Sequence, residues 1–148
     1  MIHAQNHTVG LLLASAAQTN GATRTANLDT RDADYAVITL NFSAELNTNA
    51  IGPTIQLSES DDTVVTNFAT FDSGLNVTGS DGWLAAAKVH EARVDTKYRK
   101  RYIRLSVTAP TATNDTFTMG ATYRLSKNEK PSSTTDMAAT TNDTVVIG

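Results

Sequence analysis

A basic stretch from Tyr98 to Val107 holds the residues whose types and spacing best suit binding chemistry. Together with the lysine just before it, it carries five of the twelve basic residues, interleaved with tyrosines. Such side chains can hold phosphates and stack on bases or sugars, and they are enriched at protein interfaces. They can equally be solvated residues that protect a strand from edge pairing. Because the formal net charge is −3, we expect a protein partner and no nucleic acid, with these residues at the interface: Lys97, Arg99, Lys100, Arg101, Tyr102 and Arg104.

Two acidic clusters could offer oxygen ligands to a metal ion. One contains Asp29, Asp32 and Asp34, and the other contains Asp61 and Asp62. Ca²⁺ takes six to eight oxygen ligands, but neither cluster has the glycine and closing glutamate of an EF-hand loop. Asp also starts turns before strands, so no metal is expected, although bound calcium stays an open alternative. A carboxylate pair could serve glycoside hydrolysis, yet nothing selects one pair among the fifteen acidic residues.

The remaining catalytic residue types form no motif. His3, His7 and His90 are widely spread along the chain. The sequence contains no Gly-x-Ser-x-Gly turn, no Gly-rich phosphate loop and no His-Glu-x-x-His zinc motif. The absence of cysteine removes disulfides, thiol catalysis and thiolate-bound zinc. We therefore expect a protein that is not an enzyme and that needs no cofactor.

Alternating apolar residues predict the strands that must position these groups. Residues 36–42 and 117–125 alternate without a break, as residues 103–107 of the basic stretch do. In that stretch we expect one apolar face and one opposite face that carries Lys100 and Arg104 together with Tyr102. The basic stretch is thus predicted to be a strand with one side in a core.

The middle of the chain is harder to interpret. Residues 54–58 and 63–70 favour strands. After Gly82, good helix formers predict a short helical turn, followed by a strand that ends at Val94. We expect this strand to turn at residues 95–97 and to pair with the basic stretch as a β-hairpin.

Both ends of the chain carry apolar segments. Residues 9–17 predict a first strand or an extended arm, with Val9, Leu11 and Leu13 on one face. No Lys or Arg precedes them, so a secretory signal is not expected. The chain after Pro131 is rich in Ser and Thr, and a neighbouring chain is the simplest support for its apolar end, Val145, Val146 and Ile147. We expect an arm or first strand (1–17), a β-sandwich domain (18–130) and a tail (131–148).

Composition and strand spacing together predict the fold class. A length of 148 residues with 40% hydrophobic residues suits one globular domain. Thr, at 24 residues, suits pleated surfaces, and Asn and Ser suit turns. About eight strands at short spacing are typical of all-β sandwiches and jelly rolls. We expect an all-β, single-domain antiparallel β-sandwich, jelly-roll-like, with extended N- and C-terminal arms.

Three runs in this order resemble small virion proteins of tailed bacteriophages: residues 28–35, 57–63 and 99–105. The similar proteins are described as capsid cement, decoration or minor structural proteins, and the resemblance covers residues 8–130. It implies a β-sandwich or jelly-roll subunit that is made in the host bacterial cytoplasm, oligomerises and sits on a shell of major capsid protein. The resemblance carries over no active site.

We therefore expect a structural virion protein that stabilises the outer surface of a phage capsid. Its partners would be major capsid protein and further copies of itself, as a dimer or trimer, with no nucleic acid and no membrane. The contacts would come from the basic stretch and from the arms, the latter through Leu11, Leu13, Val145, Val146 and Ile147. Two alternatives stay open: a tail or neck component, and a carbohydrate-binding module in which Trp83 and the tyrosines stack on sugars.

Overall fold

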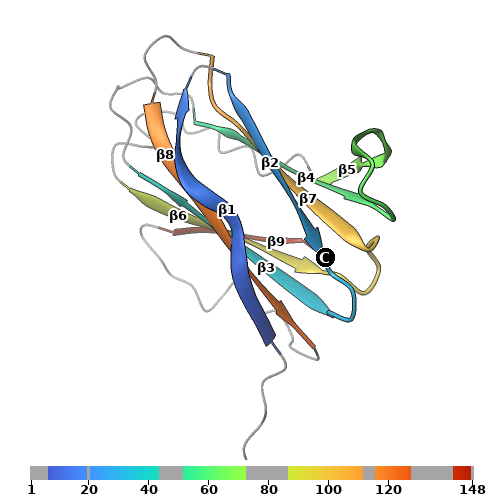
Figure 1. The fold of residues 1–148 in the computed structure, drawn as a ribbon. Helices are drawn as coiled ribbons and strands as arrows, with labels where there is room; N and C mark the ends of the chain where they lie inside the picture. Colours follow the sequence, from blue (N-terminus) through green and yellow to red (C-terminus); the bar gives the residue numbers. More distant parts are fainter. Residues whose placement is uncertain are drawn as a thin grey trace, which may run out of the picture.

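The computed structural model describes residues 7–19, 21–43, 52–72, 87–111, 116–127 and 142–147. Within these residues the chain is all-β, as predicted, with nine strands and one 3₁₀ turn, η1 (Val65–Asn67). The strands form a five-stranded sheet in the order β1-β8-β3-β6-β9 and a four-stranded sheet in the order β2-β7-β4-β5 (Figure 1). Their bounds are β1 His7–Thr19, β2 Thr23–Asp29, β3 Tyr35–Phe42, β4 Thr54–Ser60, β5 Ala69–Asp72, β6 Lys88–Asp95, β7 Tyr102–Thr108, β8 Thr116–Ser126 and β9 Asn142–Ile147.

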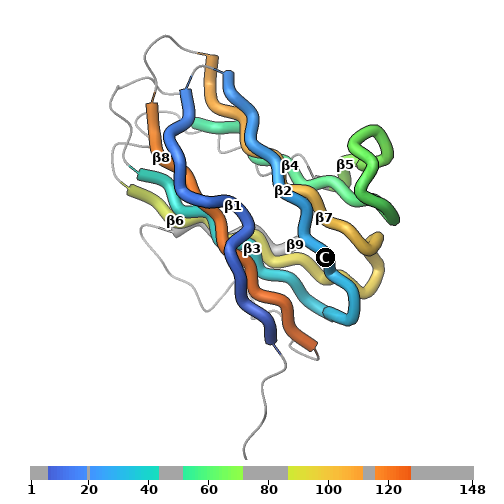
Figure 2. Tube along the Cα trace, in the orientation of Figure 1, coloured from blue at the N-terminus to red at the C-terminus, as the bar shows by residue number. Residues whose placement is uncertain are grey.

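The core consists of apolar side chains from both sheets. Because successive residues of a strand point to opposite faces, the alternating strands bury one face each. The predicted face of β3, from Ala36 to Phe42, is at most 2% exposed. In β8, Phe117, Met119 and Ala121 are buried, while Tyr123 and Leu125 pack partly against the same cluster. The four-stranded sheet adds Leu28, Ile55, Leu57, Ile103, Leu105 and Val107, so the two layers of Figure 2 share one sandwich-like core.

The predicted hairpin between β6 and the basic stretch is wrong. β6 pairs with β3 and β9 in one sheet, whereas β7 pairs with β2 and β4 in the other. Both strands need one buried face, and they achieve this from opposite layers. The link between them is tied to the β2–β3 turn, because the Thr96 hydroxyl donates to the Ala33 carbonyl oxygen at 2.6 Å and the Thr96 N–H donates to the Asp34 carbonyl oxygen at 2.9 Å.

The predicted shared face of Val9, Leu11 and Leu13 is also wrong. Val9 and Leu11 are 64% and 66% exposed, whereas Leu13 is buried at 7%. The register between β1 and β8 shifts between Leu11 and Leu13 and again before Ala16. Because one extra residue in a strand moves the following side chains to the other face, the first of these bulges brings Leu13 into the core and leaves Val9 and Leu11 outside.

Close packing against β8 explains the glycine in this strand. A Cβ atom at Gly10 would lie 2.6 Å from the ring and hydroxyl of Tyr123. Only a residue without a side chain allows the ring to lie over the backbone here. The first strand is therefore fitted to β8 rather than laid loosely on it.

The C-terminal strand completes the five-stranded sheet. The pairs β1–β8, β8–β3 and β3–β6 are antiparallel. β9 runs parallel to β6, with Val145 opposite Ala92. The segment predicted to need a neighbouring chain thus pairs with its own chain. The helical turn predicted after Gly82, and Trp83, lie outside the described residues, and the division of the chain at residues 17 and 130 stays a prediction.

Candidate functional site: the basic turn and the β4–β5 loop

The basic residues are divided between a turn and the start of a strand. β7 begins at Tyr102, so Lys100 lies in the preceding turn, residues 97–101 (the basic turn), and not on the strand face predicted for it. Ile103 and Leu105 of β7 are fully buried. In register across β7, Asn27 of β2 and Ser58 of β4 flank Arg104. Three strands therefore position the basic residues at one end of the four-stranded sheet.

Arg104 is buried by the loop that joins β4 and β5. It is only 9% exposed, and its guanidinium carbon lies 3.7 Å from the ring centroid of Phe68. Its Nε donates to Asn27 Oδ1 at 2.9 Å, and its Nη1 donates to the Val65 carbonyl oxygen at 3.3 Å. A planar guanidinium can make a ring stack and directed hydrogen bonds together. Arg104 thus attaches the loop to the sheet and is not an open cation.

Arg101 is held by a carboxylate from β2. Its Nε and Nη2 donate to Asp29 Oδ1 and Oδ2 at 3.1 and 2.7 Å, a two-point pair that fixes the orientation of both groups. Its guanidinium also lies 4.6 Å from the ring centroid of Tyr102. The hydrogen bond from Arg101, assisted by the Arg31 backbone N–H, lowers the pKa of Asp29 below its ordinary value of 3.8.

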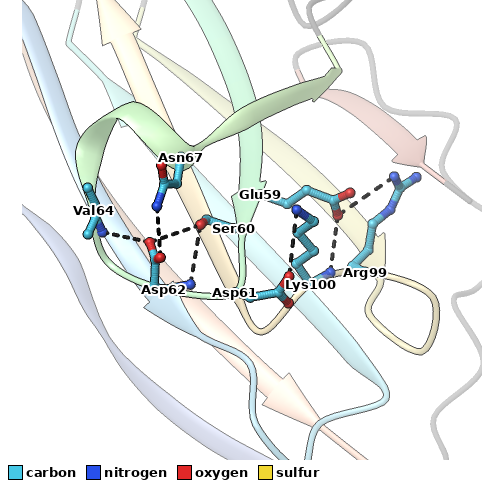
Figure 3. Close-up of polar contacts among 8 residues, drawn as sticks. All are labelled: Glu59, Ser60, Asp61, Asp62, Val64, Asn67, Arg99 and Lys100. Carbon is cyan, nitrogen blue, oxygen red and sulfur yellow. Dashed lines mark hydrogen bonds and ion pairs between the residues drawn. The ribbon is translucent and has the colours of Figure 1, made fainter.

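Arg99 and Lys100 contact acidic residues at the end of β4 (Figure 3). Glu59 Oε2 accepts from the Lys100 backbone N–H at 3.3 Å and lies 3.9 Å from Arg99 Nη1. Lys100 Nζ lies 3.6 Å from Asp61 Oδ2. The Arg99 guanidinium also lies 4.3 Å from the ring centroid of Phe71. Both cations are thereby directed along the β4–β5 loop.

Asp62 organises the start of that loop. Its Oδ1 accepts from the Val64 backbone N–H at 2.9 Å and from the Ser60 hydroxyl at 3.3 Å, and its Oδ2 accepts from Asn67 Nδ2 at 2.8 Å (Figure 3). The Asn67 hydrogen bond, followed by that from Val64, lowers the pKa of Asp62. This local bonding explains why residues 63–70, predicted as a strand, form η1 before β5 begins at Ala69.

The site as a whole carries mixed charge and is largely prearranged. Lys97, the remaining cation, has its Nζ 5.3 Å from the ring centroid of Tyr35. Each basic residue of the predicted interface thus faces a carboxylate or an aromatic ring of its own chain. No group of three or more acidic or histidine side chains within the described residues is arranged to hold a metal ion. Such a surface suits polar contact with a folded partner.

Tyr98 was missing from the predicted interface, although it lies in the basic turn. It is 90% exposed, between Lys97 and Arg99, and is the most exposed of the large apolar residues described. Its position between two cations, directly after the turn predicted at residues 95–97, was the available signal. The rings of Phe68 and Phe71 could not be assigned to the site from sequence, because they are about thirty residues away from the arginines that they cover.

The terminal residues of the predicted interface lie elsewhere. Leu11 is exposed and Leu13 is buried on β1, whereas residues 145–147 belong to β9. β1 and β9 are the two opposite edge strands of the five-stranded sheet. The structure does not bring these terminal groups together into one site.

A scan of protein-family models finds no match to this chain, and a search of curated proteins finds none either. The resemblance to virion proteins therefore stays a prediction that depends on three short runs. Within the described part of the chain, no helix has the length and apolar character needed to cross a membrane.

Proposed function

We propose that this protein is a non-enzymatic structural protein that binds the outer surface of a phage capsid and stabilises it. In this proposal the basic turn contacts the major capsid protein. The observation that carries it is Tyr98, a tyrosine that is 90% exposed on a turn whose flanking cations are positioned by their own chain. Tyrosine and arginine are the residue types that most often dominate binding energy at protein interfaces.

The internal pairing of the cations supports a protein partner over nucleic acid. Binding to phosphates depends on cations that replace counterions along the backbone. Here Arg101 is paired with Asp29, Lys100 with Asp61 and Arg104 is buried. A folded partner can match such a pattern of both signs, whereas a uniformly negative polymer meets the carboxylates as well.

Oligomerisation through the chain ends is the second part of the proposal. β1 is an edge strand of the five-stranded sheet, and its outward residues Val9 and Leu11 are exposed. An exposed strand edge can pair with a strand from another chain. In a jelly-roll-like subunit with such arms, many weak contacts over a shell would add up through avidity.

Capsids prepared without this protein, from a phage whose genome encodes it, provide the test. Purified protein should co-sediment with these capsids and raise the temperature at which they disrupt. Tyr98→Ala should lower the affinity at least about tenfold, and because this side chain is exposed, the free energy of unfolding should stay unchanged.

The matched control is Val65→Ala, which shortens a side chain that is 71% exposed on the neighbouring loop. It should leave capsid binding intact. Absence of binding to capsids, or equal binding by the two variants and the unaltered protein, contradicts the proposal. Binding to tails or necks in place of capsids would assign the protein to that part of the virion.

A further inference from the structure

A second polar site lies where β1 begins, β8 ends and the β2–β3 turn passes between the sheets. It is a cavity of about 320 Å³ lined by residues of all three segments. This volume is at the lower end of the range for small-molecule sites. None of the residues assigned above to the basic turn lines it.

Two cations at this cavity differ from those of the basic turn. Arg31 and Lys127 are exposed, and the side chain of neither forms a hydrogen bond or an ion pair within the described residues. One carboxylate, Asp32, also lines the cavity, so the three charged groups leave a net charge of +1 there. Thr8 and His7 of β1 also line the cavity.

A buried hydroxyl gives an independent indication of a ligand. Ser126 lines the cavity and is only 5% exposed, yet its Oγ has no hydrogen-bond partner among the described residues. A polar group buried in this way is destabilising unless something bonds to it. The Ser126 backbone is fixed, because its carbonyl oxygen accepts from the Asp34 N–H at 2.9 Å. The backbone at Ser126 is therefore held in place, and the bonding capacity of its hydroxyl is unused.

The β2–β3 turn that forms one wall is rigidly attached. The Thr30 N–H and hydroxyl both donate to the Arg101 carbonyl oxygen, at 2.9 and 2.8 Å. Asp32 adopts a φ of 65°, in the left-handed region that is uncommon for residues other than glycine. Such a backbone conformation persists only where the surrounding structure fixes it. At Asp32 it lies in the turn that passes the end of β8.

We propose that this cavity binds a small oxyanion of the phosphate or carboxylate type. Arg31 and Lys127 supply the charge, and Ser126, whose Oγ is covered in the structure without ligand, turns its unused O–H to an oxygen of the ligand. Charge-assisted hydrogen bonds to an oxyanion are the strongest of the hydrogen bonds available to these side chains. The site is separate from the proposed capsid contact, and its occupancy does not depend on that function.

Amide NMR spectra of the full chain, titrated with inorganic phosphate and separately with acetate at constant ionic strength, test the proposal. Saturable shifts are expected at the amides of Arg31, Ala33 and Lys127. Arg31→Gln and Lys127→Gln should each weaken binding by about tenfold. Ser126→Ala should weaken it by about threefold, and it should not destabilise the fold because the hydroxyl has no partner to lose.

Arg124→Gln is the matched control, because it removes a cation from the same strand that does not line the cavity. Its affinity for the anion should equal that of the unaltered protein. Phosphate saturation alone would identify a phosphate-bearing ligand, and acetate saturation alone would identify a carboxylate, as at a peptide chain end. Shifts that increase linearly for both anions, or equal affinities in all the variants, would overturn the site.

Discussion

Asp29 and Arg101 show at the scale of single residues how this protein holds its own charges. The pair joins the end of β2 to the turn before β7, and both oxygens of Asp29 accept from the guanidinium. Sequence reasoning identified both residues, one as an acidic turn former and the other as an interface cation. It could not pair them, because they lie 72 positions apart and meet only through the register of β2 with β7.

Replacing Arg101 with Gln should raise the pKa of Asp29 towards 3.8. In the folded protein this pKa is lowered, first by the Arg101 hydrogen bond, so folding favours the ionised form. The resulting stability is fully present above pH 3.8 and is lost as the pH falls through the folded-state value. Because the Asp29 side chain is 43% exposed, the loss of unfolding free energy at neutral pH should be below about 1 kcal/mol.

A carbon-13 NMR titration of the Asp29 carboxyl group measures this effect directly. Lys97→Gln is a suitable control, because Lys97 faces Tyr35 and does not contact Asp29. It should leave the titration of Asp29 unchanged. If Asp29 titrates at the same pH with and without Arg101, the two-point pair does not form in solution.

At the scale of elements, strand identity was predicted more successfully than strand partners. The uninterrupted alternation in β3 and β8 located both strands, because a buried face fixes the position of every second side chain. The prediction of a β6–β7 hairpin was wrong because a short link between two strands is compatible with pairing in one sheet and also with crossing to the other sheet. The predicted apolar face of β1 was wrong because its bulges depend on contacts with β8, and the alternation within β1 cannot show them.

The β4–β5 loop should lose its order when Arg104 is replaced by Ala. The side chain attaches the loop through Phe68 and the Val65 carbonyl oxygen. Removing it leaves a cavity and an unpaired Asn27 oxygen, which should cost about 2 kcal/mol of unfolding free energy. Amide hydrogen exchange should become faster at Val64 and Asn67, whose N–H groups are hydrogen-bonded within the loop.

Two further variants separate this role from a general effect of charge. Arg104→Lys keeps the charge but lacks the planar group, so it should not restore slow exchange. Lys100→Gln removes an exposed ion pair of the same loop with Asp61 and should leave exchange nearly unchanged. Equal exchange in Arg104→Ala and Lys100→Gln would show that Arg104 does not hold the loop.

For the whole molecule, the structure changes the interpretation of the C-terminal tail. From sequence, a Ser- and Thr-rich tail with a short apolar end lacked any partner in its own chain. The partner is the edge of β6, which becomes available only because β6 joins the five-stranded sheet and does not pair with β7. The wrong pairing of β6 thus also concealed the partner that the tail has within its own chain, and contact of the tail with a neighbouring subunit stays a prediction.

A chain that ends at Pro131 lacks β9 and should expose the edge of β6. An unpaired strand edge promotes association with other chains, so the shortened protein should unfold at a lower temperature and its mass should rise with concentration. Size-exclusion chromatography with light scattering on both forms measures the mass. If the full chain is instead a stable oligomer that dissociates on truncation, β9 pairs with a neighbouring subunit in solution, and the tail would act as the predicted clamp. If the mass of the full-length protein is independent of concentration and the truncated form associates, β9 protects the edge of its own sheet. In that case β1 is the edge of this sheet that remains available for assembly.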